Sequence, residues 1–144
     1  TKPSDCTDLF IDYLKISAIK KGADFITADG QVIKNEVLTN RAPNLVSYAY
    51  CSDTAYNEAV LPYLNGVDVL YHEATYLNDM AELAAERGHA TALQAATIAK
   101  KAKAKCLLLG HFSSRYANLN PFLLEAKQVF ANTAIATEGE TYKI

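Results

Sequence analysis

The strongest constraint on the fold is a short apolar run, residues 106–109, that leads directly into His111. A run of this length, bounded by a lysine-rich stretch and a glycine, is typical of a buried parallel strand. In open α/β sheets, ligands bind at the carboxyl ends of such strands. We therefore expect His111 at a functional edge, where Ser113, Ser114 and Arg115 follow it as two hydroxyls and a fixed cation.

Two further predicted strands end in polar residues in the same way. Residues 45–51 lead to Asp53, and residues 67–71 lead to His72 and Glu73. If these strands are parallel neighbours, their carboxyl ends meet at one rim of the sheet. Carboxylates and imidazoles are both metal ligands and acid-base groups, so such a rim would suit metal and proton-transfer chemistry.

The elements between these strands predict an α/β fold. Thr91 and Gln94 form a capping box ahead of an alanine-rich helix, and Asp29-Gly30 predicts a two-residue hairpin turn. A further hairpin is expected around Glu138-Gly139 at the end of the chain. Residues 9–16 favour a short helix, although a strand remains possible. The predicted helices between and after the strands span 56–64, 78–87, 91–104 and 121–130.

Composition limits the class of protein. A chain of 144 residues, half of them hydrophobic, is expected to form a single folded domain. No apolar run approaches the ~20 residues that span a bilayer, and we expect a cytoplasmic protein. The net charge of −2 gives no basic footprint of the kind that marks general nucleic-acid binders. Cys6, Cys51 and Cys106 are widely spaced and odd in number, which favours reduced thiols.

Each candidate side chain also has a structural interpretation. Asp53 could cap a following helix, and His111 could simply bind backbone at the end of a strand. His89 could be a surface loop residue, but it precedes the alanine-rich helix, whose free N–H groups would favour an anion such as phosphate. A nearby Glu73 would favour protonated His89, giving a general acid. Arg115 could be a solvated charge, yet its fork geometry suits phosphate.

Four motifs in chain order resemble those of ribonuclease Z, the metallo-β-lactamase-fold endonuclease that trims the 3′ trailer from precursor tRNA. They are Ser-Asp-Thr at 52–54, His-Glu-Ala-Thr at 72–75, Gly-His-Ala-Thr at 88–91, and Leu-Gly-His-Phe-Ser-Ser-Arg-Tyr at 109–116. The segment 20–39 is also similar to the one that precedes the aspartate motif there. Any one motif would be weak evidence, but together they extend the resemblance over nearly the whole chain.

The resemblance implies a role for each matching residue. Asp53 corresponds to the aspartate that bridges two zinc ions, and His111 to a histidine ligand of the second. Glu73 and His89 correspond to the pair that assists proton transfer to the departing 3′ oxygen. Ala90 stands where the family usually has serine. The residues expected on the substrate side, near the cleaved phosphate, are His72, Ser113, Ser114 and Arg115.

The family's His-x-His-x-Asp-His cluster is not found in this sequence. The only histidines are His72, His89 and His111, and the upstream third ligand histidine and the arm that grips tRNA are missing too. We therefore expect residues 1–144 to be the C-terminal half of a metallo-β-lactamase αββα sandwich, a mixed sheet with helices on one face. A zinc site needs about four donors, so this chain alone is expected to bind zinc weakly or not at all and to be inactive.

Three functional hypotheses remain open at this stage. The first is a zinc-dependent endoribonuclease acting on precursor tRNA once its N-terminal half is supplied. The second is a non-catalytic assembly module, and the third a related metallo-phosphodiesterase. A half-sandwich also leaves a sheet face uncovered, so we expect two copies of the chain to pair as a homodimer.

Overall fold

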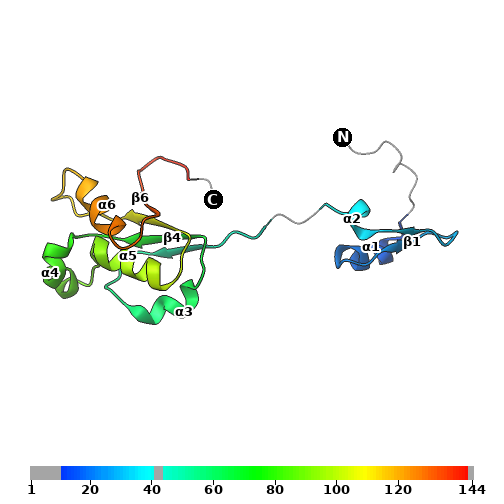
Figure 1. The fold of residues 1–144 in the computed structure, drawn as a ribbon, viewed down its shortest axis with the longest axis horizontal. Helices are drawn as coiled ribbons and strands as arrows, with labels where there is room; N and C mark the ends of the chain where they lie inside the picture. Colours follow the sequence, from blue (N-terminus) through cyan, green and yellow to red (C-terminus); the bar gives the residue numbers. More distant parts are fainter. Residues whose placement is uncertain (1–10, 41–43, 143–144) are drawn as a thin grey trace. The chain divides into compact units, whose positions relative to one another are not determined.

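The computed structural model describes residues 11–40 and 44–142, and the chain forms two compact units, Thr1–Asn44 and Leu45–Ile144. We describe each unit by itself (Figure 1). The described part of the first unit contains helix α1 (Tyr13–Lys20), strands β1 (Phe25–Ile26) and β2 (Val32–Ile33), and helix α2 (Asn35–Leu38). The structure therefore resolves the ambiguity near the N-terminus in favour of a helix, which Asp12 caps by accepting from the N–H of Leu14.

The predicted hairpin at Asp29-Gly30 is present, but its loop is longer than two residues. β1 and β2 pair antiparallel, and the N–H of Thr27 donates to the carbonyl of Gln31. Three residues therefore lie between the last paired positions, with Gly30 in the left-handed region at φ 87°. A three-residue loop with glycine at that position is the next most common hairpin geometry.

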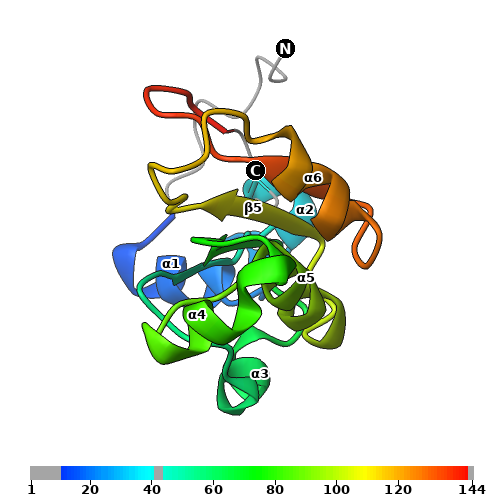
Figure 2. The same ribbon diagram turned by 90° about the vertical axis from the view of Figure 1, so that its left-hand side faces the viewer.

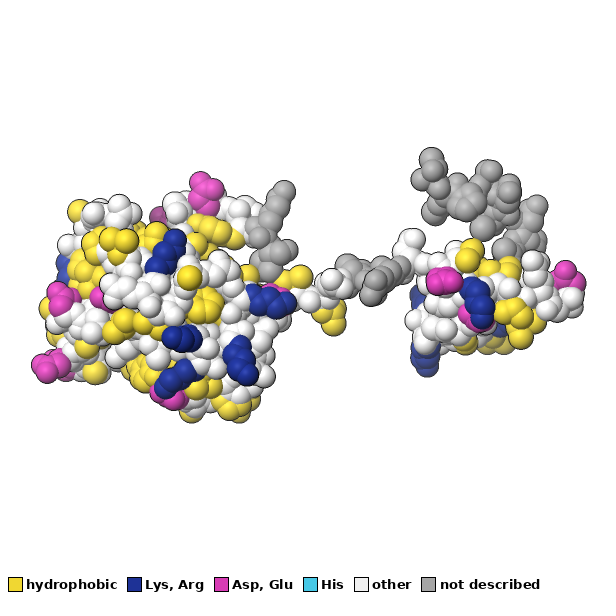
Figure 3. All heavy atoms as spheres, in the orientation of Figure 1, with side chains coloured by type: hydrophobic (Ala, Val, Ile, Leu, Met, Phe, Trp, Pro, Cys, Tyr) yellow, Lys and Arg dark blue, Asp and Glu magenta, His cyan; other side chains and the backbone are white. Residues whose placement is uncertain are grey.

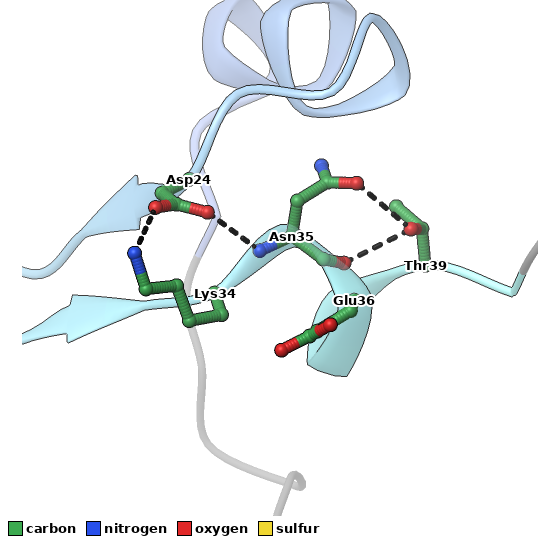
Figure 4. Close-up of a pocket in the computed structure, with 5 residues that line it drawn as sticks. All are labelled: Asp24, Lys34, Asn35, Glu36 and Thr39. Carbon is green, nitrogen blue, oxygen red and sulfur yellow. Dashed lines mark hydrogen bonds and ion pairs between the residues drawn. The ribbon is translucent and has the colours of Figure 1, made fainter.

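A surface hollow in this unit is lined by side chains that bind one another (Figure 4). Asp24 accepts from Lys34 Nζ at 2.9 Å and from the N–H of Asn35 at 2.8 Å. Thr39 in turn donates to the Asn35 side chain. These contacts fix α2 against the hairpin, so the residues that line the hollow have a structural role.

The second unit is built on a four-stranded sheet in the order β3-β4-β5-β6. The strands are β3 (Tyr48–Cys51), β4 (Val69–Glu73), β5 (Cys106–Gly110) and β6 (Thr133–Ile135). All three strand pairs are parallel, so the expectation of a mixed sheet is wrong for the described residues. The first strand of the predicted terminal hairpin is present as β6, which adds to the edge of the sheet beside β5. Most of the second strand, expected at residues 142–144, lies outside the described residues.

Helical segments connect successive strands. Between β3 and β4 lie the 3-10 turn η1 (Glu58–Val60) and α3 (Leu61–Leu64), and between β4 and β5 lie η2 (Asn78–Met80), α4 (Ala81–Glu86) and α5 (Ala92–Lys101). Helix α6 (Asn120–Lys127) precedes β6. The predicted capping box is present, since Thr91 and Gln94 each bind the other's backbone N–H. No helix in the described ranges is long and apolar enough to cross a bilayer.

One face of the sheet carries the core. Leu70, Leu107 and Leu109 are fully buried against the alanines of α5 and against Phe122 of α6. Alanine has only a methyl group, so the helix axis can lie close to the strands (Figures 1 and 2). This arrangement confirms the expected α/β fold with helices packed on one face.

The opposite face of the sheet is open along its edge strand β3 within this unit. Tyr48 is 52% and Tyr50 63% exposed, although both are strand residues. The Tyr50 ring stacks on the ring of Tyr71 at a centroid distance of 4.6 Å. Tyr71 in turn lies over Gly110, where an added Cβ would come within 2.1 Å of the Tyr71 hydroxyl.

The two described thiols, Cys51 and Cys106, are both free, as expected from the cysteine spacing. Burial raises the pKa of each thiol. Cys6 and the predicted irregular start of the chain lie outside the described residues.

Candidate active site

The predicted rim forms at the carboxyl ends of β3, β4 and β5. Asp53 follows β3, Glu73 is the last residue of β4, and His111 follows β5. Three described residues other than glycine have positive φ, and two of them are Asp53 at 50° and His111 at 58°. Left-handed backbone at such residues costs about 1–3 kcal/mol and is concentrated at functional sites. The chain therefore leaves β3 and β5, the strands on either side of β4, through strained turns that direct these two side chains.

The rim brings together four side chains with metal-ligating atoms. One ligand atom from each of Asp53, Glu73, His89 and His111 lies within 4.8 Å of the others. His111 Nε2 is 3.2 Å from Asp53 Oδ1, and the rings of His89 and His111 have centroids 5.4 Å apart. Asp53 does not cap a helix, because Asn57 caps η1 instead.

Glu73 is fully buried and accepts a hydrogen bond at each of its four lone-pair positions. Oε1 accepts from the N–H of Thr54 at 2.6 Å and faces His89 Nδ1 at 3.0 Å. Oε2 accepts from the Thr75 hydroxyl at 2.7 Å and the N–H of Ala90 at 3.1 Å. Burial raises the pKa of Glu73, but these hydrogen bonds outweigh it and hold the pKa below its usual value. The carboxylate is therefore ionised. We call it the buried anchor, because it holds the four groups that donate to it in place.

The contact with Glu73 orients His89. An ionised carboxylate can only accept, so Nδ1 of His89 is the protonated nitrogen that faces it. The imidazole is 23% exposed and packs edge-on to the ring of Tyr76 at 6.1 Å. His89 Nε2 is consequently the nitrogen available for proton transfer.

The lone pairs that remain decide which residues can hold a metal ion. Glu73 has none left, whereas His89, whose Nδ1 faces Glu73, keeps the lone pair on Nε2. Asp53 and His111 also keep open ligand atoms, and an aspartate oxygen with imidazole nitrogens is a donor set that zinc accepts. Asp53 and His111, even with His89 Nε2, offer fewer than the roughly four donors that one zinc ion needs, so the described residues fit part of a zinc site.

Two sequence-based expectations about this region are wrong. His72 does not reach the rim, because it is 2% exposed on the core face, where its Nδ1 lies 2.8 Å from the carbonyl of Glu73. Adjacent residues of a strand point to opposite faces, so His72 and Glu73 could not both reach the cluster. Burial lowers the pKa of His72, which keeps the ring neutral.

The N-terminus of α5 also has no free N–H groups for an anion. The N–H of Ala92 donates to Tyr76, that of Leu93 to the Glu125 carboxylate, and that of Gln94 to the Thr91 hydroxyl. The expected phosphate site at this helix end is therefore wrong.

Arg115 lies beside the cluster. Its guanidinium is 5.1 Å from the centroid of the Tyr76 ring, which in turn contacts His89. Ser113 and Ser114 lie in the turn after His111, where the N–H of Ser113 donates to the carbonyl of Thr75 at 3.1 Å. This bond fixes the turn that presents Arg115.

Sequence reasoning assigned no role to Thr75 or Tyr76. Thr75 is buried and binds both Glu73 and His111, and Tyr76 lies between Arg115 and His89. Thr75 belonged to one of the recognised motifs, which was the available signal. Nothing in the sequence pointed to Tyr76.

Comparison of structures defines the class of protein. The model is similar to the metallo-β-lactamase fold protein YhfI from Bacillus subtilis, with a TM-score of 0.59 and 32% identity over 63% of this chain and 37% of that one. Together with the parallel sheet and its metal-ligating edge, this likeness identifies the chain as part of a metallo-β-lactamase fold. No protein-family model matches the sequence.

Within that class, the chain is homologous to ribonuclease Z. It is 47% identical to the ribonuclease Z of Cytophaga hutchinsonii over 136 residues, which is 93% of this chain and 43% of the relative. It is 45% identical to the ribonuclease Z of Parabacteroides distasonis over 94% of this chain and 45% of the relative. The chain thus spans somewhat less than half the length of the curated relatives that it matches.

Proposed function

We propose that this chain carries part of the active site of a zinc-dependent endoribonuclease that removes the 3′ trailer from precursor tRNA. The observation that carries the proposal is the pairing of two open ligands, Asp53 and His111, with an adjacent anchored imidazole, His89. The homology to ribonuclease Z supports the same substrate class. The cleavage activity is proposed for the intact protein and not for these 144 residues alone.

In this proposal Asp53 and His111 hold zinc together with ligands from an N-terminal half that contains the His-x-His-x-Asp-His cluster. Bound zinc would supply Lewis-acid stabilisation of the phosphate and activation of water. The strained turns at Asp53 and His111 fix both ligands before a metal arrives. Ligands that are already fixed lose little conformational entropy on binding.

His89 is proposed to donate the proton to the departing 3′ oxygen from Nε2. Glu73 holds the other ring nitrogen, which fixes the orientation of the imidazole. Arg115, stacked on Tyr76, is proposed to bind the phosphate through its guanidinium. Ser113 and Ser114 are proposed to contact the substrate from the same turn.

Charge on the described surface gives little general affinity for RNA. The chain has a net charge of −2, and Figure 3 shows the lysine and arginine side chains of the second unit interspersed with acidic and apolar ones on the visible face. Because the phosphate backbone dominates nucleic-acid affinity, the grip on tRNA must come mainly from the other part of the protein. This surface also supports the proposal that the 144 residues alone do not cleave tRNA.

The test compares the intact protein with its His89→Gln variant on precursor tRNA and on a small phosphodiester. We expect trailer removal to fall by about 10²–10⁴-fold in the variant, as for loss of a general acid. Glu82→Gln, on the exposed surface of α4, is the matched control and should retain full activity. Equal cleavage of the small diester and the tRNA precursor would instead favour the metallo-phosphodiesterase hypothesis.

A second experiment tests the proposed division of the zinc site. Isothermal titration of zinc into the 144-residue chain should give an affinity at least ~100-fold below that of the intact protein, since even second-shell losses cost 10–100-fold. Efficient trailer removal by the 144-residue chain alone would contradict the proposal.

A further inference from the structure

Thr75 lies at the centre of the candidate site, although it is neither a proposed metal ligand nor a proposed acid. Its side chain is in the loop directly after β4, and the residue is 6% exposed. The hydroxyl oxygen is 2.7 Å from Glu73 Oε2, 2.9 Å from His111 Nδ1 and 3.0 Å from the carbonyl oxygen of His111. One hydroxyl therefore joins the buried anchor to a proposed zinc ligand.

The Thr75 hydroxyl has a single proton, and its position determines which of its two neighbours, Glu73 and His111, accepts from Thr75 and which donates to it. Glu73 is ionised, so it can only accept, and at 2.7 Å it needs the proton of Thr75 to avoid repulsion between two oxygens. A hydroxyl that donates to Glu73 still has lone pairs to offer. His111 Nδ1, at 2.9 Å, must then donate its own proton to Thr75.

The competing arrangement places the proton on His111 Nε2, where it would bind Asp53 at 3.2 Å. Nδ1 would then accept from Thr75, and Glu73 would lose a hydrogen bond. The side chain of Glu73 is fully buried, whereas that of Asp53 is 73% exposed and can bind water instead. Losing one hydrogen bond costs a buried carboxylate more than an exposed one, because water can replace the donor at the exposed group. The Nδ1-protonated form of His111 is therefore favoured.

We propose that Thr75 is a positioning residue that selects the Nδ1-protonated tautomer of His111 and so directs the Nε2 lone pair toward Asp53 and a shared cation. The significance for zinc rests on the function proposed above, but the tautomer itself does not. A ring that already has the correct tautomer needs no proton rearrangement when metal arrives. Hydrogen bonding of this kind commonly orients histidine ligands.

Nitrogen-15 NMR of the histidine rings tests the tautomer in the zinc-free 144-residue chain at about pH 8, above the ordinary imidazole pKa. The chain has three histidines, so single substitutions assign each ring. His72 is an internal reference, because its Nδ1 faces a carbonyl and must carry the proton. We expect wild-type His111 to match His72, and Thr75→Val to shift His111 toward the Nε2-protonated form.

Two control variants show whether an effect of Thr75→Val comes from loss of the Thr75 hydroxyl. Thr75→Ser keeps the hydroxyl and should retain the wild-type tautomer. Thr97→Val removes a hydroxyl that binds only the Leu93 carbonyl within α5, and should leave His111 unchanged. An Nε2-protonated His111 in the wild-type protein, or identical spectra for wild type and Thr75→Val, would overturn the proposal. The wild-type spectrum decides even if the valine variant fails to fold.

Zinc affinity of the intact protein provides the second measurement. We expect Thr75→Val to bind zinc about 10–100-fold more weakly, with Thr75→Ser close to wild type. If the tautomer changes as expected but the intact protein has no nuclease activity, the proposed function fails and the positioning role stands. If activity is present but the tautomer is insensitive to Thr75, only the positioning role fails.

Discussion

Glu73 determines the geometry of the candidate site because it connects three segments that are distant in sequence. Its carboxylate binds the backbone after β3 through Thr54, the loop after β4 through Thr75, and the segment before α5 through His89 and Ala90. Charge-assisted hydrogen bonds are about twice as strong as neutral ones. The buried carboxylate therefore stabilises the fold and orients the imidazole with the same contacts.

Replacing Glu73 with glutamine tests this double role. The amide nitrogen cannot accept, so two of the four donors lose their partner, at about 1–3 kcal/mol for each buried group left unpaired. We expect urea unfolding of Glu73→Gln to give a free energy of unfolding lower by about 2–6 kcal/mol. Glu82→Gln on the surface of α4 should stay within ~0.5 kcal/mol of wild type. Similar losses in both variants would show that Glu73 is not an anchor.

Sequence predicted much of the site because each strand ends at its functional residue. Asp53, Glu73 and His111 could be placed at one rim from the strand pattern alone. The pattern could not show that His72 points to the core, since the strand boundary had been set before it. It could not show the contacts of Thr75 either, because hydrogen bonds between loops depend on side-chain geometry that spacing does not encode.

At the scale of elements, Glu125 of α6 joins two helix beginnings. Its Oε1 accepts from the N–H of Leu93 in α5 at 2.9 Å, and its Oε2 from the N–H of Asn78 in η2 at 3.0 Å. A carboxylate at a helix N-terminus also interacts favourably with the helix dipole. These bonds tie α6 to the segment that carries His89.

Removing that carboxylate should loosen the whole helical layer. We expect Glu125→Ala to lower the free energy of unfolding by about 1–3 kcal/mol, because two helix-end N–H groups lose an ionised partner. Hydrogen exchange should also become faster at Leu93 and Asn78. Glu86→Ala, at the exposed end of α4, is the comparison, and unchanged exchange in Glu125→Ala would contradict the expected role.

Asp68 makes the start of the sheet sensitive to acid. Lys105 binds its carboxylate at 2.6 Å, and the N–H and hydroxyl of Ser47 each donate at 2.7 Å, so these contacts lower the pKa of Asp68 far below its usual value. A carboxyl whose pKa is lowered on folding stabilises the native state above its unfolded pKa of 3.8. That stabilisation is lost as pH falls toward the folded-state pKa.

Thermal unfolding of Asp68→Asn against wild type measures this contribution. We expect the variant to have a lower Tm from neutral pH down to about pH 5, with the difference shrinking below about pH 4 as the unfolded wild-type chain takes up the proton. Asp79→Asn, in the exposed turn η2, is the control and should track wild type throughout. A Tm difference that grows on acidification would contradict the expected sign.

The strand-helix alternation from residue 45 onward was predictable because apolar runs, capping residues and glycine stops agree with one another. The capping box at Thr91 and the burial of residues 107–109 are examples. The position of β6 was not predictable, since three residues can pair with any free edge. Glu138-Gly139 suggested a hairpin, and the described part of this segment shows Tyr142 donating to the carbonyl of Ile135.

At the scale of the molecule, the second unit has helices on one face of its sheet and tyrosines on the other. Tyr48 and Tyr50 remain more than half exposed. A sheet face this apolar needs a cover, and the relatives are more than twice as long as the matched segment. We propose that the other half of the metallo-β-lactamase sandwich covers it in the intact protein.

The 144-residue chain produced alone is predicted to cover this face with a second copy. Light scattering at micromolar concentration should show a dimer, and Tyr50→Glu should shift it to monomer by placing a charge in the stacked pair of Tyr50 and Tyr71. Tyr63→Glu is the matched control, because Tyr63 is 88% exposed on α3 and lies outside the tyrosine face. A well-folded wild-type monomer, or equal dissociation by both variants, would show that the open face does not drive pairing.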